Sequence, residues 1–206
     1  TGIGGITSLA LAPDGKHLYA SGAASQAIAG FAINATTGAL NQVSVIRQAD
    51  GLNGLNGVTD LAFNASGEVL FATAGANQSV SALRRDSASG ALTYVVGIES
   101  AQGVEASLES PSALAIAGDR VFVADAQGDA VNLLRFVDGD DPGFDLDGVI
   151  KLDNDDQNGT QQPVALMFVA DQARLYVASA GSSQLHLYSL LGEAPKLIAS
   201  YDTSTS

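Results

Sequence analysis

The sequence predicts an all-β repeat protein in which four consecutive four-stranded antiparallel blades stack as in a β-propeller. Three observations predict this fold class. A motif recurs four times at a period of about 52 residues, apolar residues come in short alternating runs, and Gly, Asn, Asp and Pro separate the runs. No long segment has the periodicity of an amphipathic helix. A single blade cannot bury both of its faces, and radial stacking of twisted sheets solves that problem.

The recurring motif opens each repeat unit. Its first copy reads Ile6-Thr-Ser-Leu-Ala-Leu11, and the other copies begin at Val58, Pro111 and Pro163. A second column joins an apolar residue to an aromatic one, as Leu18-Tyr19, Leu70-Phe71, Val121-Phe122 and Leu175-Tyr176. We therefore expect residues 1–206 to form a single propeller unit, with blades at about residues 6–57, 58–110, 111–162 and 163–206.

The first unit shows how four strands fit into one repeat. Its apolar runs predict strands at residues 8–12, 17–21, 27–33 and 40–46. The sequences Pro13-Asp-Gly15 and Thr36-Thr-Gly38 supply turns between strands. Four antiparallel strands joined in this way make one blade.

Side-chain size predicts where the blades meet. The small residues Ala10, Ala62 and Ala115 fit an innermost strand, where blades crowd around the axis, and Met167 breaks this column in the fourth unit. Larger side chains are expected to form layers between the blades, because aromatic residues dominate protein cores. They are Phe31, Phe63, Phe71, Phe122, Phe136, Phe168, Tyr176 and Tyr188.

Charge and composition exclude several classes of partner. The 206 residues carry a formal net charge of -13, which repels nucleic acid and anionic membrane surfaces. No apolar run is long enough to insert into a bilayer, and the chain has no cysteine for disulfides or thiolate metal sites. The start at Thr1-Gly2 suggests a processed or excised piece of a longer protein.

Several strings resemble the lactonase-like (YVTN-type) β-propeller repeat. They are Ala12-Pro-Asp-Gly-Lys-His-Leu-Tyr-Ala20, Ile28-Ala-Gly-Phe-Ala-Ile33, Thr37-Gly-Ala-Leu40 and the linker Asp50-Gly-Leu-Asn-Gly-Leu-Asn-Gly57. The linker is similar to one found in very large exported bacterial proteins, so the resemblance implies an extracellular, cell-surface or periplasmic location. It also implies rings of roughly six to eight blades. Four units leave three interpretations: a fragment, a closed four-bladed ring, or half of a ring completed by a second copy.

The sequence offers no recognisable catalytic constellation. His17 and His186 are the only histidines, and neither belongs to a metal-binding or nucleophile–base motif. We expect His17 to be a solvent-facing strand residue. Enzymes of the lactonase-like family gather polar groups at the mouth of the channel, whereas the inner-strand column here reads Ser8, Asp60, Ala113 and Ala165. Asp60 is the one ionisable residue in this column. A single carboxylate is not enough for acyl transfer, which also needs an acid and hydrogen-bond donors to the oxyanion.

Acidic residues concentrate in the third unit. Carboxylates interspersed with Gly and Asn suit Ca²⁺, which takes six to eight oxygen ligands. The alternative is a set of solvated turns. The candidate metal ligands are Asp138, Asp140, Asp145, Asp147, Asp153 and Asp155.

Three functions follow from these features. The first is a non-catalytic binding or scaffold module of an exported or cell-surface protein that docks a protein or glycan. The second is a lactonase-type hydrolase, which rests on the family resemblance. The third is a structural half-propeller that assembles with itself.

Overall fold

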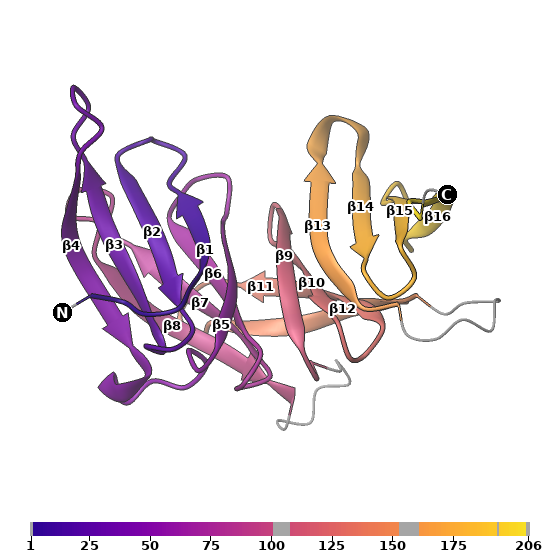
Figure 1. Cartoon of the computed structure of the whole chain (residues 1–206), viewed down its shortest axis with the longest axis horizontal. Coiled ribbons are helices and arrows are strands. Elements are labelled where there is room, and N and C mark those ends of the chain that lie inside the picture. Colours follow the sequence, from indigo (N-terminus) through magenta and orange to yellow (C-terminus); the bar gives the residue numbers. More distant parts are fainter. Residues whose placement is uncertain (1, 101–107, 153–160, 193, 205–206) are drawn as a thin grey trace.

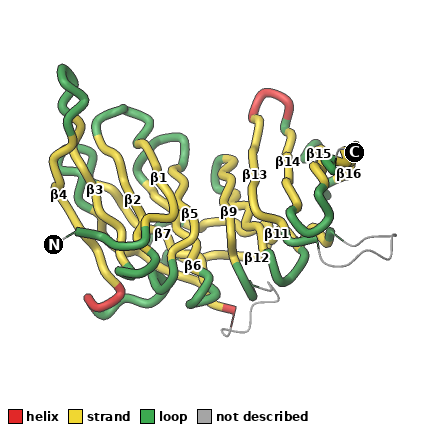
Figure 2. Tube along the Cα trace, in the orientation of Figure 1, coloured by secondary structure: helices red, strands yellow, loops and turns green. Residues whose placement is uncertain are grey.

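The computed structural model describes residues 2–100, 108–152, 161–192 and 194–204. Its strands form four antiparallel four-stranded sheets, each with its strands in chain order (Figures 1 and 2). The prediction of four consecutive propeller blades is therefore confirmed. No helix in these ranges is long and apolar enough to cross a membrane.

The strand bounds repeat from blade to blade. Blade 1 holds β1 (Ile6–Leu11), β2 (His17–Gly22), β3 (Ala27–Ile33) and β4 (Leu40–Arg47). Blade 2 holds β5 (Val58–Phe63), β6 (Val69–Ala74), β7 (Ser79–Arg85) and β8 (Leu92–Glu99). Blade 3 holds β9 (Pro111–Ala117), β10 (Arg120–Asp125), β11 (Ala130–Val137) and β12 (Gly143–Lys151). Blade 4 holds β13 (Pro163–Val169), β14 (Arg174–Ser179), β15 (Gln184–Ser189) and β16 (Lys196–Asp202). The short 3-10 helices η1 (Gln48–Asp50) and η3 (Ala170–Gln172) lie at turns.

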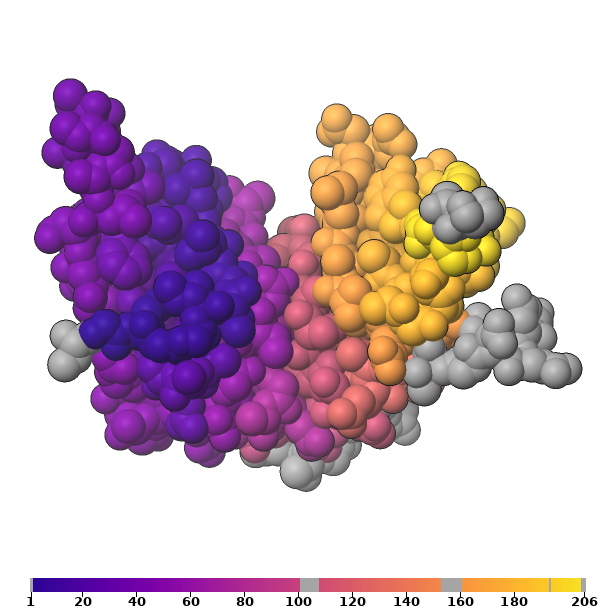
Figure 3. Space-filling model, viewed as in Figure 1, coloured from indigo at the N-terminus to yellow at the C-terminus, as the bar shows by residue number. Residues whose placement is uncertain are grey.

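The four blades form an open arc rather than a closed ring. The inner strands β1, β5, β9 and β13 contact one another in sequence, and the blade 1 and blade 4 ends of the arc stand apart (Figure 1). The space-filling view shows a notch between these two ends (Figure 3). The interpretation as a closed four-bladed ring is therefore wrong, and an incomplete propeller is what this chain forms.

Each pair of neighbouring blades encloses its own apolar core. We call the face of a blade that meets the following blade its forward face, and the opposite face its backward face. Tyr19 of blade 1 packs edge-on against Phe63 of blade 2, with ring centroids 5.4 Å apart. Phe122 of blade 3 stacks on Phe168 of blade 4 at 6.0 Å. The expected aromatic layers are confirmed for Phe63, Phe71, Phe122, Phe136, Phe168 and Tyr188, whereas Phe31 and Tyr176 lie outside the cores between blades.

The two ends of the arc expose the residue columns that are buried inside it. Leu9, on the backward face of blade 1, is 60% exposed, whereas Leu61 and Leu114 in the same column are each 5% exposed. On the forward face of blade 4, Met167 is 63% exposed, whereas Ala10 in its column is 7% exposed. The exposure therefore follows from the missing neighbours and not from the local sequence.

A hydroxyl group ties each inner strand to the next one. The second residue of one inner strand donates its side-chain O–H to the first backbone carbonyl of the following inner strand. The pairs are Thr7 and Val58 (2.6 Å), Thr59 and Pro111 (2.8 Å), and Ser112 and Pro163 (2.7 Å). Blade 4 has Val164 at the donor position, so its forward face cannot continue this series.

We predict that Thr59→Val lowers the free energy of unfolding by about 1–2 kcal/mol, because the near-isosteric change leaves the Pro111 carbonyl and the buried Thr73 hydroxyl without this partner. Urea-induced unfolding measures the change. The matched control Thr36→Val alters an exposed turn and is expected to shift stability by less than about 0.5 kcal/mol. Equal effects of the two substitutions would contradict a role for the inter-blade hydroxyl.

Candidate functional site

Asp60 on the inner strand of blade 2 holds three blades together. Its Oδ1 accepts a hydrogen bond from the Ser8 hydroxyl of blade 1 (2.7 Å) and its Oδ2 accepts one from the Leu114 backbone N–H of blade 3 (2.8 Å). The same Oδ1 also accepts the Leu61 backbone N–H at 2.8 Å. Both carboxylate oxygens are therefore engaged in joining blades, and Asp60 is poorly placed to act as a base.

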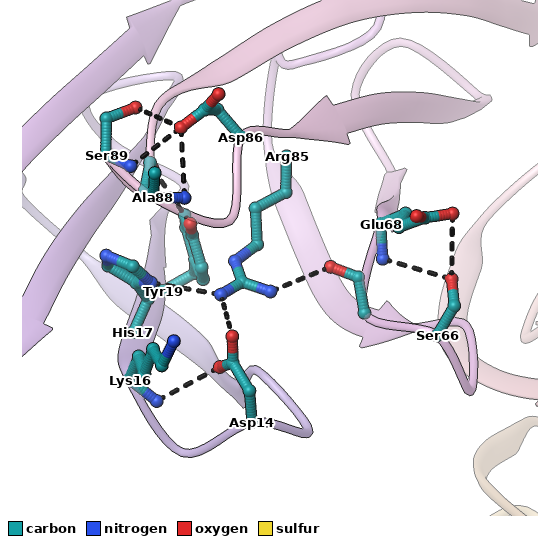
Figure 4. Close-up of polar contacts among 12 residues, drawn as sticks. Asp14, Lys16, His17, Tyr19, Ser66, Glu68, Arg85, Asp86, Ala88 and Ser89 are labelled. Atoms are coloured by element: carbon teal, nitrogen blue, oxygen red, sulfur yellow. Dashed lines mark hydrogen bonds and ion pairs between the residues drawn. The ribbon is translucent and has the colours of Figure 1, made fainter.

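A second polar cluster lies between blades 1 and 2 and is centred on Arg85 (Figure 4). The Arg85 side chain is 2% exposed, and its Nη2 donates to Asp14 Oδ2 (2.6 Å) and contacts His17 Nδ1 (3.0 Å). Nη1 donates to the Gly67 carbonyl at 3.0 Å. The hydrogen bond from Arg85 lowers the pKa of Asp14. Burial, reinforced by the Arg85 charge, lowers the pKa of His17.

His17 was expected to face solvent, and that expectation is wrong. Its side chain is buried because a turn of blade 2 covers it, and a Cβ atom on Gly90 would collide with the imidazole ring. The Tyr19 hydroxyl donates to the Gly90 carbonyl at 2.8 Å in the same place. The neutral imidazole accepts from Arg85, so the side chains of this cluster are engaged in a largely buried contact between blades 1 and 2.

We predict that Asp14→Asn lowers the free energy of unfolding by about 1–2 kcal/mol, because the buried Arg85 guanidinium loses its counter-charge. The matched control is Asp138→Asn, which removes an ion pair with Arg84 whose side chains are 46% and 47% exposed. An exposed pair contributes little, so its expected change is below about 0.5 kcal/mol. Thermal unfolding of the two variants compares them, and a larger loss in the control would refute this assignment.

A cavity of about 540 Å³ lies between the outer strands of blades 3 and 4. It is present because the fourth blade fills this space poorly. Tyr94 of β8 packs into the core between blades 1 and 2, while Leu197 takes the equivalent register position in β16 and is 48% exposed. The cavity is lined by residues of β12, β15, β16 and the turn before β16, which include Lys151, His186, Tyr188, Pro195 and Ser200.

His186 and Ser200 face each other across β15 and β16 in this cavity. Their Cα atoms are register partners, and His186 Nδ1 lies 2.9 Å from Ser200 Oγ. The other ring nitrogen, Nε2, lies 3.3 Å from Gln161 Oε1, which also accepts the Ser182 hydroxyl at 2.7 Å. Gln161 and His186 are 2% and 6% exposed, whereas Ser200 is open to the cavity.

These contacts fix the proton positions on the imidazole. An amide oxygen only accepts, so Nε2 carries the proton toward Gln161 and Nδ1 is left to accept from the Ser200 hydroxyl. Burial lowers the pKa of His186, so the ring is neutral at pH 7. Burial also raises the pKa of Tyr188 to about 12, which keeps its phenol protonated. The arrangement is a hydroxyl beside a free base.

Two of the predicted metal ligands form ion pairs with arginine side chains. Asp138 pairs with Arg84, and Asp147 on β12 pairs with Arg120 and Arg135 at 3.0 Å each. Asp145 lies on the same strand, Asp140 lies in the exposed turn before it, and Asp153 and Asp155 fall outside the described residues. Within the described ranges no three His, Cys, Asp or Glu side chains gather as a metal site. The calcium assignment stays a prediction.

The histidine–serine pair was missed by sequence reasoning because the two residues are fourteen positions apart. Their contact depends on the register of β15 with β16 and on the bulge between Leu187 and Tyr188. A hydrophobic pattern predicts that such strands exist, but it does not specify that register. The sequence offered no local motif that could have found the pair.

Comparison with known proteins identifies one family. Residues 3–104 match a family model described as lactonase, 7-bladed β-propeller. No curated protein matches the chain.

Solved structures share the fold. A candidate 6-phosphogluconolactonase from Bacteroides uniformis is 18% identical with a TM-score of 0.73, and the match covers 96% of this chain and 57% of that one. A periplasmic gluconolactonase from Pseudomonas aeruginosa is 19% identical with a TM-score of 0.71, and the match covers 97% and 58%. This chain therefore spans less than two thirds of the length of these proteins.

These findings overturn the expectation of a non-catalytic binding or scaffold module that docks a protein or glycan. The matching family model is named for a lactonase, and solved structures with the same fold carry lactonase names. They favour the alternative interpretation, a lactonase-type hydrolase.

Proposed function

We propose that this chain forms four blades of a lactonase-like hydrolase that opens cyclic esters. The observation that carries this proposal is the match of residues 3–104 to the lactonase family model. The shared fold of proteins named as gluconolactonases supports it. The name of the Pseudomonas aeruginosa protein also supports a periplasmic location, which we propose for this chain.

The geometry favours the cavity between blades 3 and 4 as the place of reaction. Ring opening of a lactone needs a nucleophile or base, a proton for the departing ring oxygen and a donor for the charge on the carbonyl oxygen. Asp60 and the Arg85 cluster are committed to inter-blade contacts. The cavity offers a neutral histidine, a hydroxyl and a lysine, and its volume suits a small-molecule ligand.

The charge of the chain favours a neutral lactone over a phosphorylated one. A net charge of -13 repels an anionic substrate over long range, and salt screens that repulsion. Lys151 is the cation in the cavity lining, and one cation offsets little of this charge. An uncharged sugar lactone therefore fits best.

We predict that the protein accelerates hydrolysis of glucono-δ-lactone above the spontaneous rate, measured as acid release at constant pH. Heat-unfolded protein at the same concentration is the control, because lactones also open uncatalysed. We further expect kcat/KM for the 6-phosphorylated lactone to be lower, and to rise with ionic strength as screening weakens repulsion. Rates equal to the uncatalysed ones for both lactones would refute the proposed function.

A second function is favoured by the exposed ends of the arc. We propose that a second copy covers them, with the forward face of blade 4 against the backward face of blade 1 of its partner. The apolar residues exposed at these two ends occupy the same positions as residues that are buried at the three interfaces inside the arc. Each end therefore presents one half of such an inter-blade interface. Pairing of both ends closes a two-fold symmetric ring.

Light scattering after size exclusion tests this pairing. We predict a mass of twice 20.8 kDa for the native chain and a monomer for Met167→Glu, because a carboxylate would be buried in the new interface. Val137→Glu, which changes a half-exposed residue at the end of β11 in blade 3, is the control and should remain dimeric. A native monomer at micromolar concentration would exclude the self-assembling function and leave the hydrolase proposal standing.

A further inference from the structure

We propose that Ser200 is a catalytic nucleophile, that His186 is its general base, and that Gln161 positions the imidazole. The inference rests on the proposed hydrolase function for its substrate class, which is a small cyclic ester. Three independent features of the chain support it: the contact geometry, the placement at the cavity, and the difference between blade 4 and the other blades.

The contact geometry matches what a nucleophile and base require. A general base must lie within hydrogen-bond reach of the proton that it removes, and His186 Nδ1 lies 2.9 Å from Ser200 Oγ. A third group must orient the base, and the Gln161 amide oxygen does this from 3.3 Å. Gln161 Nε2 is buried and has no hydrogen-bond partner among the described residues, which is costly for a purely structural side chain.

The placement gives substrate access to the hydroxyl and shields the base. Both residues line the cavity, and Ser200 is exposed while His186 is 6% exposed. Lys151 also belongs to the cavity lining, and its positive charge favours the oxyanion that forms when a carbonyl is attacked.

The blade fold itself does not require this pair. The equivalent register partners in the other blades are Ala29 and Val45, Ser81 and Gly97, and Asn132 and Val149. The first of these pairs is entirely apolar, and none of the three combines an imidazole with a hydroxyl. A hydrogen-bonded His–Ser pair at this position is therefore particular to blade 4, beside the cavity.

The reaction follows from these roles. Ser200 Oγ bonds to the carbonyl carbon of the lactone as its proton passes to His186 Nδ1. The ring C–O bond then breaks, and His186 returns the proton to the departing oxygen, which leaves a hydroxyl on a chain that is esterified to Ser200. Water, deprotonated by His186, attacks this ester and releases the hydroxy acid, and Ser200 regains its proton.

The charge environment sets the pH dependence. Lys151 and Tyr188 are the other titratable groups that line the cavity around His186, and Gln161 and Ser182 contribute neutral contacts. Because burial keeps the pKa of His186 below 6.5, the base is available at pH 7. The rate falls as the pH drops through that pKa and the imidazole becomes protonated.

Labelling with a fluorophosphonate probe, followed by peptide mass spectrometry, tests the nucleophile without depending on lactone turnover. We expect an adduct on Ser200, no adduct in Ser200→Ala, and labelling roughly 100-fold slower in His186→Asn. Ser189→Ala, a hydroxyl on β15 outside the cavity lining, is the control and should label like the native protein. Circular dichroism checks that each variant is folded.

The outcomes separate this inference from the proposed function. A labelled Ser200 without lactone hydrolysis by the native protein would contradict the substrate class and support the nucleophile. Lactone hydrolysis that persists in Ser200→Ala, with Ser200 unlabelled, would overturn the nucleophile and support the hydrolase. Absence of both hydrolysis and labelling in the folded native protein would overturn both.

The positioning role of Gln161 has its own readout. Gln161→Glu places a carboxylate beside Nε2, and a nearby negative charge favours the protonated imidazole. We expect the acidic limb of the pH profile for probe labelling to move to higher pH. A profile that stays in place while the variant remains folded would exclude an orienting contact with the imidazole.

Discussion

The stacking of each forward face on the next backward face is the interaction on which this molecule depends. A blade is too thin to bury its own side chains, so the columns at blade interfaces decide which residues form the core. Tyr19, Phe71 and Phe122 are at most 1% exposed because the following blade covers them. Tyr176 stands in the same column with no blade in front of it and remains partly exposed.

Polar contacts add direction to this apolar stacking. The hydroxyl bonds that begin at Thr7, Thr59 and Ser112 fix the height of each inner strand relative to the next, and Asp60 holds three blades at once. These contacts sit near the axis, where the blades are closest. Farther out the blades diverge, and large side chains must fill the widening gap. Where Leu197 fails to do so, a cavity opens beside the outer strands of blade 4.

The sequence predicts the blades well because a period of about 52 residues and strand alternation are local signals that repeat. It predicts individual environments less well, because these depend on other units. His17 is buried because a turn of blade 2 at Gly90 covers its side chain, and the sequence around His17 does not predict this contact. The pairing of His186 with Ser200 depends on strand register. The sequence presents Asp138 and Asp147 as candidate metal ligands, but it does not show their arginine partners, which lie on other strands.

The position of the proposed site also bears on how a partial propeller can act. A site at the axis of a ring takes its walls from every blade, so four blades would supply only part of it. The cavity at Ser200 takes its walls from blades 3 and 4, and its nucleophile, base and orienting amide all come from residues 161–200. Its geometry is therefore independent of whatever covers the two ends of the arc. Completion of the ring would change the stability and assembly of the protein while leaving this chemistry in place.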